Sequence, residues 1–240
     1  MIEPAPRKIL IVLHQEHSTP GRVGHLLLRA GLALDIRRPC LGDPLPGTLS
    51  GHAGAIIFGG PMGANDTHDF VRAEIDWIKV PLKEEKPFLG ICLGAQMLVR
   101  QLGGRVYTHA DGHAEIGYYP IVPNAAADAL CGESFPRMVY HWHRDGFDLP
   151  AGAAELASGV ETGDFPVQAL RVGANAYGIQ FHPEVTYAMM CRWTSRAAER
   201  MGAPGARARE QHLEGWHIHD APVARWIEAF LPVWAGEAAD

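Results

Sequence analysis

Several features that define large classes of proteins are missing from this 240-residue sequence. Its four cysteines, Cys40, Cys92, Cys131 and Cys191, lie far apart and form no C-x-x-C pair, so we expect free thiols rather than a disulfide framework. No apolar run approaches the roughly 20 residues that a membrane-spanning helix needs. The run Ile9–Leu13 is also too short for the core of a signal peptide. We therefore expect a cytoplasmic protein that does not bind membranes.

A surplus of positive charge is missing as well. Lysine and arginine total 21 against 27 aspartates and glutamates, which gives a net charge of −6 and argues against a nucleic-acid surface. Hydrophobic residues make up 47% and charged residues 20%, ordinary values for a globular protein. The length suits one sizeable domain with a modest appendage. We predict one domain over residues 1–200, and a linker with a C-terminal helical extension packed on it over residues 201–240.

The first hundred residues alternate between short apolar runs and stretches with helical spacing. Pro81 should kink the second of these helices or end it early. Strand–helix alternation with nearly continuous apolar strands predicts an α/β fold with a mostly parallel central sheet flanked by helices. The expected strands are Lys8–His14, Leu32–Arg37, Ala55–Phe58 and Pro87–Cys92, and the expected helices are Arg22–Ala30, Phe70–Glu85 and Leu93–Leu102.

The middle of the sequence changes to short strand-like runs separated by turn residues, which predicts antiparallel strands added to the sheet. These runs are Arg105–Thr108, Gly117–Val122, Met138–Trp142, Ala154–Ala157, and a hairpin of Val167–Val172 and Ala176–Phe181. A helix is expected at about Tyr187–Met201, followed by a linker and a last amphipathic helix at about Pro222–Trp234. That helix can cover the sheet, shield a pocket or form a homodimer contact, and all three alternatives stay open.

The segment PFLGICLGAQ, residues 87–96, joins a buried strand directly to a helix, with Cys92 at the corner between Gly90 and Gly94. A sharp strand-to-helix turn exposes its central side chain, as in the nucleophile elbow of hydrolases. The helix N-terminus favours a thiolate there. A buried core cysteine is the alternative, but the flanking glycines favour a nucleophile at Cys92.

A thiolate nucleophile needs a base, and the segment GIQFHPE, residues 178–184, offers one at the end of another strand. His182 can take the proton from Cys92, and Glu184 can hold the imidazole in the correct tautomer. The segment IIFGGPMG, residues 56–63, ends a strand in two glycines. The backbone amides of Gly60 and Leu93 can then form an oxyanion hole. A phosphate-binding loop is the rival interpretation, but the G-K-[ST] ending is absent.

Thirteen histidines raise the question of a metal site. His109 and His113 are four residues apart, but Gly112 makes a helix there doubtful. His141 and His143 share a strand face. None of the pairs has a third ligand at a recognised spacing, so we predict no metal.

Together these segments resemble the class I glutamine amidotransferases, in particular stand-alone proteins similar to the amidotransferase domain of GMP synthase. The resemblance covers about residues 8–190. It rests on Gly59-Gly60-Pro61, Gly90-Ile91-Cys92-Leu93-Gly94-Ala95-Gln96 and Phe181-His182-Pro183-Glu184, and on the stretches HAEIG at 113–117 and HWHRDGFDLP at 141–150. It implies the flavodoxin-like fold of that family.

By this resemblance, Cys92 attacks the side-chain amide of glutamine, ammonia leaves, and water hydrolyses the resulting γ-glutamyl thioester. Gln96 would help bind the substrate, with a surface helix residue as the alternative. Trp142 and His143 would line the pocket near the amino-acid end of the substrate, and core packing is the alternative for Trp142. No cofactor is implied. Family enzymes pass ammonia to a synthetase, and because this sequence contains no ATP-binding domain, such a partner would act in trans.

Two further functions are compatible with the sequence. A γ-glutamyl peptidase would use the same residues on γ-glutamyl amides such as glutathione conjugates. A non-catalytic regulatory module would keep the fold alone, but the intact cysteine, histidine and glutamate argue against it.

Overall fold

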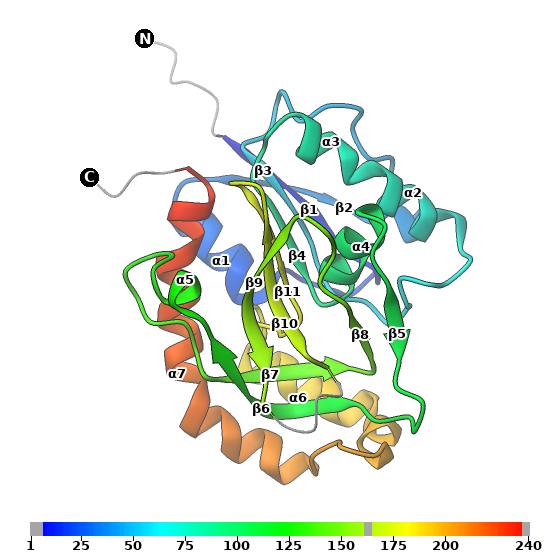
Figure 1. The fold of residues 1–240 in the computed structure, drawn as a ribbon, viewed down its shortest axis with the longest axis vertical. Helices are drawn as coiled ribbons and strands as arrows, with labels where there is room; N and C mark the ends of the chain where they lie inside the picture. Colours follow the sequence, from blue (N-terminus) through cyan, green and yellow to red (C-terminus); the bar gives the residue numbers. More distant parts are fainter. Residues whose placement is uncertain (1–6, 161–164, 237–240) are drawn as a thin grey trace.

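The structure of the chain is a computed structural model that describes residues 7–160 and 165–236. The ends of the two units expected from the sequence, positions 1–6 and 237–240, lie outside the described residues. Within the described residues, the central sheet has nine strands in the order β2-β1-β3-β4-β11-β10-β9-β6-β7 (Figure 1). A separate pair consists of β5 (Val106–Thr108) and β8 (Asp145–Phe147).

The strands from β2 to β11 in that order run parallel, and those beyond β11 are antiparallel. The predicted α/β sheet with added antiparallel strands is therefore confirmed. The strand bounds are β1 (Lys8–Val12), β2 (Ala33–Arg37), β3 (Gly54–Ile57), β4 (Phe88–Ile91), β6 (Glu115–Pro123), β7 (Met138–His143), β9 (Ala153–Gly159), β10 (Val167–Val172) and β11 (Ala176–Ile179).

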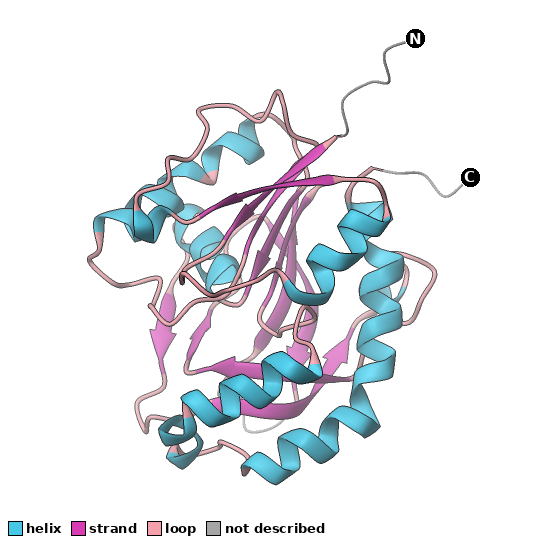
Figure 2. Ribbon diagram, turned by 180° about the vertical axis from the view of Figure 1, so that it is seen from behind, coloured by secondary structure: helices cyan, strands magenta, loops and turns pink. Residues whose placement is uncertain are grey.

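Helices cover both faces of the sheet (Figures 1 and 2). Because side chains alternate along a strand, β1 serves two cores. Ile9 and Ile11 belong to the core shared with α1 and α7, whereas Leu10 and Val12 belong to the one shared with α2 and α4. The helices are α1 (Gly21–Arg29), α2 (Asp69–Trp77), α3 (Lys79–Lys83), α4 (Leu93–Gln101), α5 (Ala125–Asp128), α6 (Tyr187–Arg196) and α7 (Arg209–Trp234), with 3-10 turns η1 (Pro39–Leu41) and η2 (Ala198–Gly202).

The predicted early end of the second helix is confirmed. α2 stops at Trp77 and α3 begins at Lys79. Pro81 has no N–H to bond the carbonyl of Trp77, and its ring clashes with that carbonyl, so the two segments cannot form one regular helix.

The start predicted for the last helix, about Pro222, is wrong, because α7 begins at Arg209 and contains Pro222. Packing on both sides of the proline outweighs its missing hydrogen bond. Before it, Gly215 lies so close to the sheet that a β-carbon there would be 2.5 Å from Cδ2 of Tyr118. After it, Val223 and Trp226 are buried.

The C-terminal part of α7 contributes large aromatic side chains to the main core. Trp226, Phe230 and Trp234 are buried in the same core as Ile9 and Ile11 of β1. Trp226 and Phe230 stack with ring centroids 5.0 Å apart. The division of the chain at residue 200 stays a prediction.

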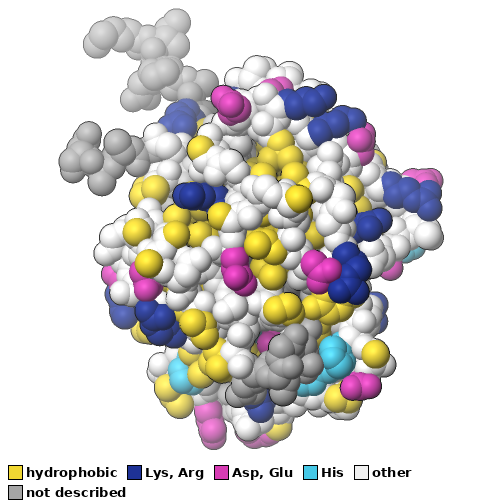
Figure 3. Space-filling model, in the orientation of Figure 1, with side chains coloured by type: hydrophobic (Ala, Val, Ile, Leu, Met, Phe, Trp, Pro, Cys, Tyr) yellow, Lys and Arg dark blue, Asp and Glu magenta, His cyan; other side chains and the backbone are white. Residues whose placement is uncertain are grey.

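Two further observations concern the surface. Among the described residues, no helix combines the length and the apolar character that crossing a bilayer requires. Acidic and basic side chains are interspersed over the face of the molecule shown in Figure 3.

Candidate active site

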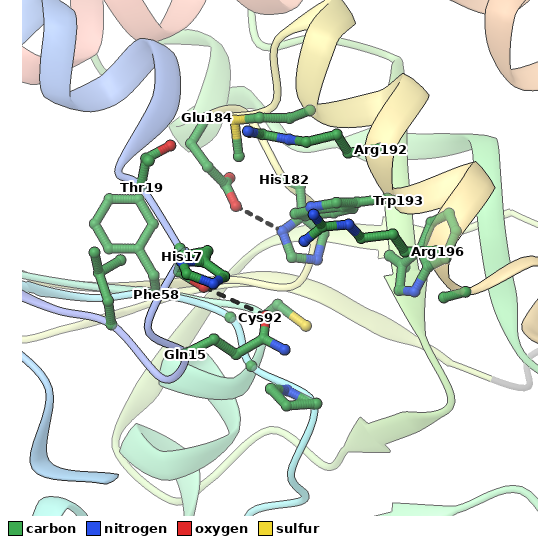
Figure 4. Close-up of a pocket in the computed structure, with 18 of the residues that line it drawn as sticks. Gln15, His17, Thr19, Phe58, Cys92, His182, Glu184, Arg192, Trp193 and Arg196 are labelled. Carbon is green, nitrogen blue, oxygen red and sulfur yellow. Dashed lines mark hydrogen bonds and ion pairs between the residues drawn. The ribbon is translucent and has the colours of Figure 1, made fainter. Parts of the chain in front are cut away.

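The predicted functional segments meet at one edge of the sheet. Each follows the carboxyl end of one of the neighbouring parallel strands β3, β4 and β11, where ligands bind in open α/β sheets. They surround a cavity of about 720 Å³ (Figure 4). Its lining includes Gly59 and Gly60 after β3, Cys92 after β4, and His182 and Glu184 after β11.

Cys92 occupies a strained corner between β4 and α4. Its backbone angles are φ 51° and ψ −104°, a conformation that costs a non-glycine residue about 1–3 kcal/mol. The corner is held from both sides: the Cys92 amide donates to the carbonyl of Ile179 at 2.8 Å, and the Cys92 carbonyl accepts the first α4 bond from Gln96 at 3.1 Å. The side chain therefore stands at the helix N-terminus, where positive partial charge favours a thiolate.

The glycines around this corner are required by close contacts. A β-carbon on Gly90 would lie 2.5 Å from the carbonyl of Gly94, and one on Gly94 would lie 2.1 Å from the carbonyl oxygen of Ile57. A β-carbon on Gly59 would meet Cε1 of His182 at 2.8 Å and Cβ of Cys92 at 3.5 Å. The histidine, the cysteine and the glycine loop are therefore in mutual contact.

His182 and Glu184 form a buried pair, with 2.8 Å between imidazole Nδ1 and carboxylate Oε1. The His182 amide also donates to the Tyr140 carbonyl of β7 at 2.9 Å, which fixes the start of the turn. Burial opposes protonation of the imidazole, but the negative charge of Glu184, the nearby sulfur of Cys92 and the hydrogen bond to Glu184 outweigh it and raise the pKa of His182 to about 10. A protonated imidazole next to sulfur stabilises a thiolate.

The two amides expected to form the oxyanion hole are available. In residues 7–160 and 165–236, no carbonyl or side chain accepts a hydrogen bond from the backbone N–H of Gly60 or Leu93. Leu93 is the first residue of α4, where helix N–H groups have no intrahelical partner. Their oxyanion role stays a prediction.

The three residues expected to bind substrate lie in different places. Trp142 is half-buried and lines the cavity. Gln96 is buried, and its side-chain amide donates to the Asp145 carbonyl at 2.9 Å, so it is not a surface residue. His143 is buried behind the cavity, and the lining formed by the described residues includes neither it nor Gln96.

Two parts of the cavity were missed in the sequence. One is the loop of residues 15–19 after β1, whose position was predictable because β1 lies beside β3 in the parallel part of the sheet. The other is the C-terminal half of α6 with η2, which supplies Arg192, Trp193, Arg196 and Arg200. The Trp193 ring packs edge-on against His182 with centroids 5.1 Å apart. No local sequence signal identifies these residues as lining the cavity.

The structure places Glu115 next to His141 and His143. Glu115 is thus a third candidate metal ligand, which the spacing of residues in the sequence did not reveal. One donor atom from each lies within 4.8 Å of the others, so this group has the composition and proximity of a metal site. Hydrogen bonds already use these atoms: Glu115 Oε2 is 2.9 Å from His143 Nε2 and accepts from Gln168 at 2.9 Å. The absence of a metal stays a prediction.

Comparison with known proteins identifies the family of the chain. The family model "Glutamine amidotransferase class-I" matches residues 27–190, well over half of the chain. The chain belongs to the class I glutamine amidotransferase family. The resemblance noted in the sequence is thereby confirmed, and the family fold accounts for the parallel half of the sheet.

Among curated relatives, this chain is 28% identical to the glutamine amidotransferase-like protein YfeJ of Salmonella typhimurium, over 75% of this chain and 76% of that protein. It is 37% identical to the glutamine-hydrolysing GMP synthase of Porphyromonas gingivalis over 60% of this chain, but that match spans only 27% of the synthase.

Two solved structures of amidotransferases are similar over nearly the whole chain. The glutamine amidotransferase of Methylobacillus flagellatus superimposes with a TM-score of 0.86 at 25% identity, covering 98% of this chain and 95% of that one. The amidotransferase of Thermotoga maritima superimposes with a TM-score of 0.84 at 28% identity, covering 95% of this chain and 98% of that one. The similarity therefore extends through most of the C-terminal helical part.

Proposed function

We propose that this amidotransferase hydrolyses the side-chain amide of glutamine to glutamate and ammonia, with Cys92, His182 and Glu184 as a catalytic triad. One observation carries the proposal. A cysteine in a strained backbone conformation at a helix N-terminus shares a cavity with a buried histidine–carboxylate pair. Strain of this kind persists where it serves a mechanism, and the pair supplies the base that a thiol nucleophile needs.

The proposed chemistry follows from the positions of these groups. The sulfur of Cys92 attacks the amide carbon of glutamine, and the carbonyl oxygen becomes an oxyanion that accepts hydrogen bonds from the amides of Gly60 and Leu93. His182 takes up the thiol proton and delivers it to the leaving nitrogen, so ammonia departs and a thioester remains. A water molecule then attacks the thioester and releases glutamate. Glu184 holds the imidazole through Nδ1, which leaves Nε2 for proton transfer.

The acceptor of the ammonia is a separate question. The chain spans about a quarter of the length of the GMP synthases that it matches. We infer that a synthetase in trans receives the ammonia, by analogy with the rest of such an enzyme. Co-purification of the chain with an ATP-dependent synthetase would support this, and ammonia release at the same rate with and without that partner would oppose it.

The test of the triad combines turnover with labelling. Glutamate release from glutamine should be measured for the wild type and for Cys92→Ala. A diazoketone analogue of glutamine should label Cys92 in the wild type, as shown by peptide mass spectrometry. Wild-type protein that neither releases glutamate from any γ-glutamyl compound nor is labelled would favour the non-catalytic module instead.

A second substrate class is favoured by the size and charge of the cavity. A volume of about 720 Å³ is that of a site for a drug-sized ligand, larger than glutamine needs. Arg192, Arg196 and Arg200 line it at intervals of four residues, and none of them forms an ion pair within the described part of the chain. We therefore infer that γ-glutamyl amides whose amine part carries a carboxylate are alternative substrates.

A matched pair of substrates separates the two possibilities. γ-Glutamylglycine carries a free carboxylate beyond the scissile amide, whereas γ-glutamylglycinamide has the same shape without that charge. If the arginines bind the substrate, kcat/KM should be higher for the charged compound and should exceed the value for glutamine. Equal values for both compounds, with glutamine preferred, would leave glutamine as the substrate.

A further inference from the structure

A second buried histidine–carboxylate pair lies behind the glycine loop that follows β3. His14 is the second residue after β1, and its Nε2 is 2.8 Å from Oε2 of Glu74 in α2, with both side chains fully buried. Its other ring nitrogen, Nδ1, is 3.1 Å from the carbonyl oxygen of Gly59. The second oxygen of Glu74 is buried without a partner in the described residues. The triad does not use this pair.

The contact with Gly59 fixes the direction of one peptide group. No peptide bond among the described residues is cis, and in a trans peptide the carbonyl and the following N–H point in opposite directions. Gly59 and Gly60 line the cavity, while His14 is not part of the lining formed by the described residues. A carbonyl of Gly59 held toward His14 therefore turns the N–H of Gly60 toward the cavity, where an oxyanion would form.

The backbone alone does not fix this orientation, because the peptide joins two glycines and glycine has little steric preference among backbone conformations. A larger residue at either position would cause a steric clash. A β-carbon on Gly59 would meet His182, and one on Gly60 would lie 2.8 Å from Cβ of His14 and 2.9 Å from its Cγ. The loop needs glycines for space, so its orientation has to be held by a hydrogen bond from outside.

The hydrogen bonds of the pair also fix its proton count. The Gly59 carbonyl is an acceptor, so Nδ1 of His14 must carry a proton. The 2.8 Å contact needs a second proton, on Nε2 or on the carboxyl of Glu74. Because the pair holds two protons, Nε2 can stay hydrogen-bonded to Glu74 while Nδ1 donates to the loop.

We infer that His14 and Glu74 are positioning residues that hold the amide of Gly60 in the oxyanion hole. The inference rests on the proposed hydrolysis, since an oxyanion forms only during attack on a carbonyl. Removing the pair leaves Cys92, His182 and Glu184 untouched but frees the Gly59–Gly60 peptide to turn away. The expected loss is that of one oxyanion donor, about 10²–10³-fold in kcat.

The test compares two reactions of Cys92 in the same variants. Hydrolysis of glutamine or a γ-glutamyl amide passes through an oxyanion. Alkylation by iodoacetamide does not, because a C–S bond forms at a saturated carbon as the C–I bond breaks and iodide leaves. His14→Phe combined with Glu74→Leu removes both polar partners together and leaves no buried charge. We expect kcat to fall about 10²–10³-fold, with KM within about threefold and the alkylation rate within about twofold of wild type.

Two further variants keep the test decisive if the double variant folds poorly. Glu74→Gln can donate to Nε2 of His14 while Nδ1 still donates to Gly59, so it should retain kcat within about fivefold, whereas Glu74→Leu should not. His52→Phe is the control, because His52 also pairs with a carboxylate, Asp35 at 3.1 Å, but does not line the cavity. Its kcat should match the wild type.

The possible outcomes lead to different conclusions. A wild type that hydrolyses no γ-glutamyl compound refutes the proposed function and this inference with it. A wild type that is active, with an equally active double variant or equally active Glu74→Leu, refutes the inference alone. A parallel loss of alkylation and hydrolysis also refutes it, because that pattern indicates general damage to the site.

Discussion

Arg22 and Asp220, 198 positions apart in the sequence, form an ion pair in which Nη2 of Arg22 lies 2.7 and 2.6 Å from the two carboxylate oxygens of Asp220. Arg22 also holds the turn that carries His182 and Glu184. Its backbone amide donates to the carbonyl of Glu184 at 2.8 Å and its guanidinium to that of Pro183 at 3.3 Å. The C-terminal helix α7 therefore supports the candidate active site through Arg22.

Asp220→Asn should weaken this support. The ion pair is only about 15% exposed on each side, so leaving Arg22 partly unpaired should cost about 1–3 kcal/mol in the free energy of unfolding. Because the turn then loses one anchor, we expect kcat to fall about tenfold, in the manner of a misplaced catalytic group. Urea unfolding and steady-state hydrolysis measure the two effects.

Glu228→Gln is the matched control, since Glu228 pairs with Arg29 between the same two helices, α7 and α1. Nη1 of Arg29 lies 3.5 Å from Oε1 of Glu228, and the two side chains are 74% and 56% exposed. Loss of this pair should therefore change the free energy of unfolding by less than about 0.5 kcal/mol. If both variants kept wild-type kcat, the ion pair of Arg22 with Asp220 would have no part in positioning the turn.

The triad predicts an order of effects. Cys92→Ala should abolish hydrolysis. His182→Ala should lower kcat nearly as much, because members of a triad act as a unit. Glu184→Gln keeps a hydrogen-bonding group beside Nδ1 and should lose less, on the order of 10²–10⁴-fold. Circular dichroism should show an unchanged fold in all three. Equal rates for wild type and His182→Ala would mean that another group is the base.

The strain at Cys92 gives a prediction about stability rather than rate. Glycine accepts a positive φ without the steric cost that alanine bears. We therefore expect Cys92→Gly to be about 1 kcal/mol more stable than Cys92→Ala, measured by urea unfolding. Cys191 lies inside helix α6, where glycine is a poor helix former. There we expect the opposite result, with Cys191→Ala more stable than Cys191→Gly by a similar amount. If the alanine variant were the more stable one at both positions, backbone strain at Cys92 would be contradicted.

Sequence reasoning located the catalytic candidates because each is tied to the end of a strand. An apolar run followed by Gly59, Cys92 or His182 marks the carboxyl end of a parallel strand, and such ends share one edge of the sheet. Two of the glycine requirements, at Gly90 and Gly94, were also deducible, since a sharp strand–helix corner leaves no room for a β-carbon. Local pattern and general topology were sufficient for these residues.

The remaining parts of the site depend on tertiary packing that has no local signal. Gln96 turns inward because strand β8, which was not expected, brings the Asp145 carbonyl within reach. Glu115 joins His143 only through the pairing of β6 with β7. The pair of His14 and Glu74 joins a loop to a helix 60 positions away. Contacts of this kind follow from how elements pack and not from the spacing of residues.

Charge at the cavity mouth should control the choice of substrate. The double variant Arg192→Gln, Arg196→Gln should raise KM for γ-glutamylglycine by about tenfold, while KM for γ-glutamylglycinamide stays the same, because these exposed arginines act by attraction of a carboxylate. Raising the salt concentration should weaken the preference in the wild type only. Arg72→Gln, an exposed arginine of α2, is the control. A similar change of KM for both substrates would refute a role in reading charge.

The buried group of Glu115, His141 and His143 predicts how stability depends on pH. Burial opposes ionisation of Glu115, but the two histidines and Gln168 outweigh it and lower its pKa to about 2 from 4.5. Burial lowers the pKa of His141 to about 3 from 6.5. In both cases the unfolded chain binds the proton first as the pH falls, so stability present above pH 6.5 should be lost between pH 6.5 and pH 2.

Urea unfolding across this range tests the expectation. Each group should contribute a slope of up to about 1.4 kcal/mol per pH unit within its own window. Glu115→Gln has no carboxyl to protonate, so it should be less stable than wild type at pH 7 but lose less stability between pH 4.5 and pH 2. Glu214→Gln, at an exposed position of α7, should follow the wild-type curve. Parallel curves for wild type and Glu115→Gln would contradict a low pKa for Glu115, because its carboxyl would then bind protons equally in the folded and unfolded chains.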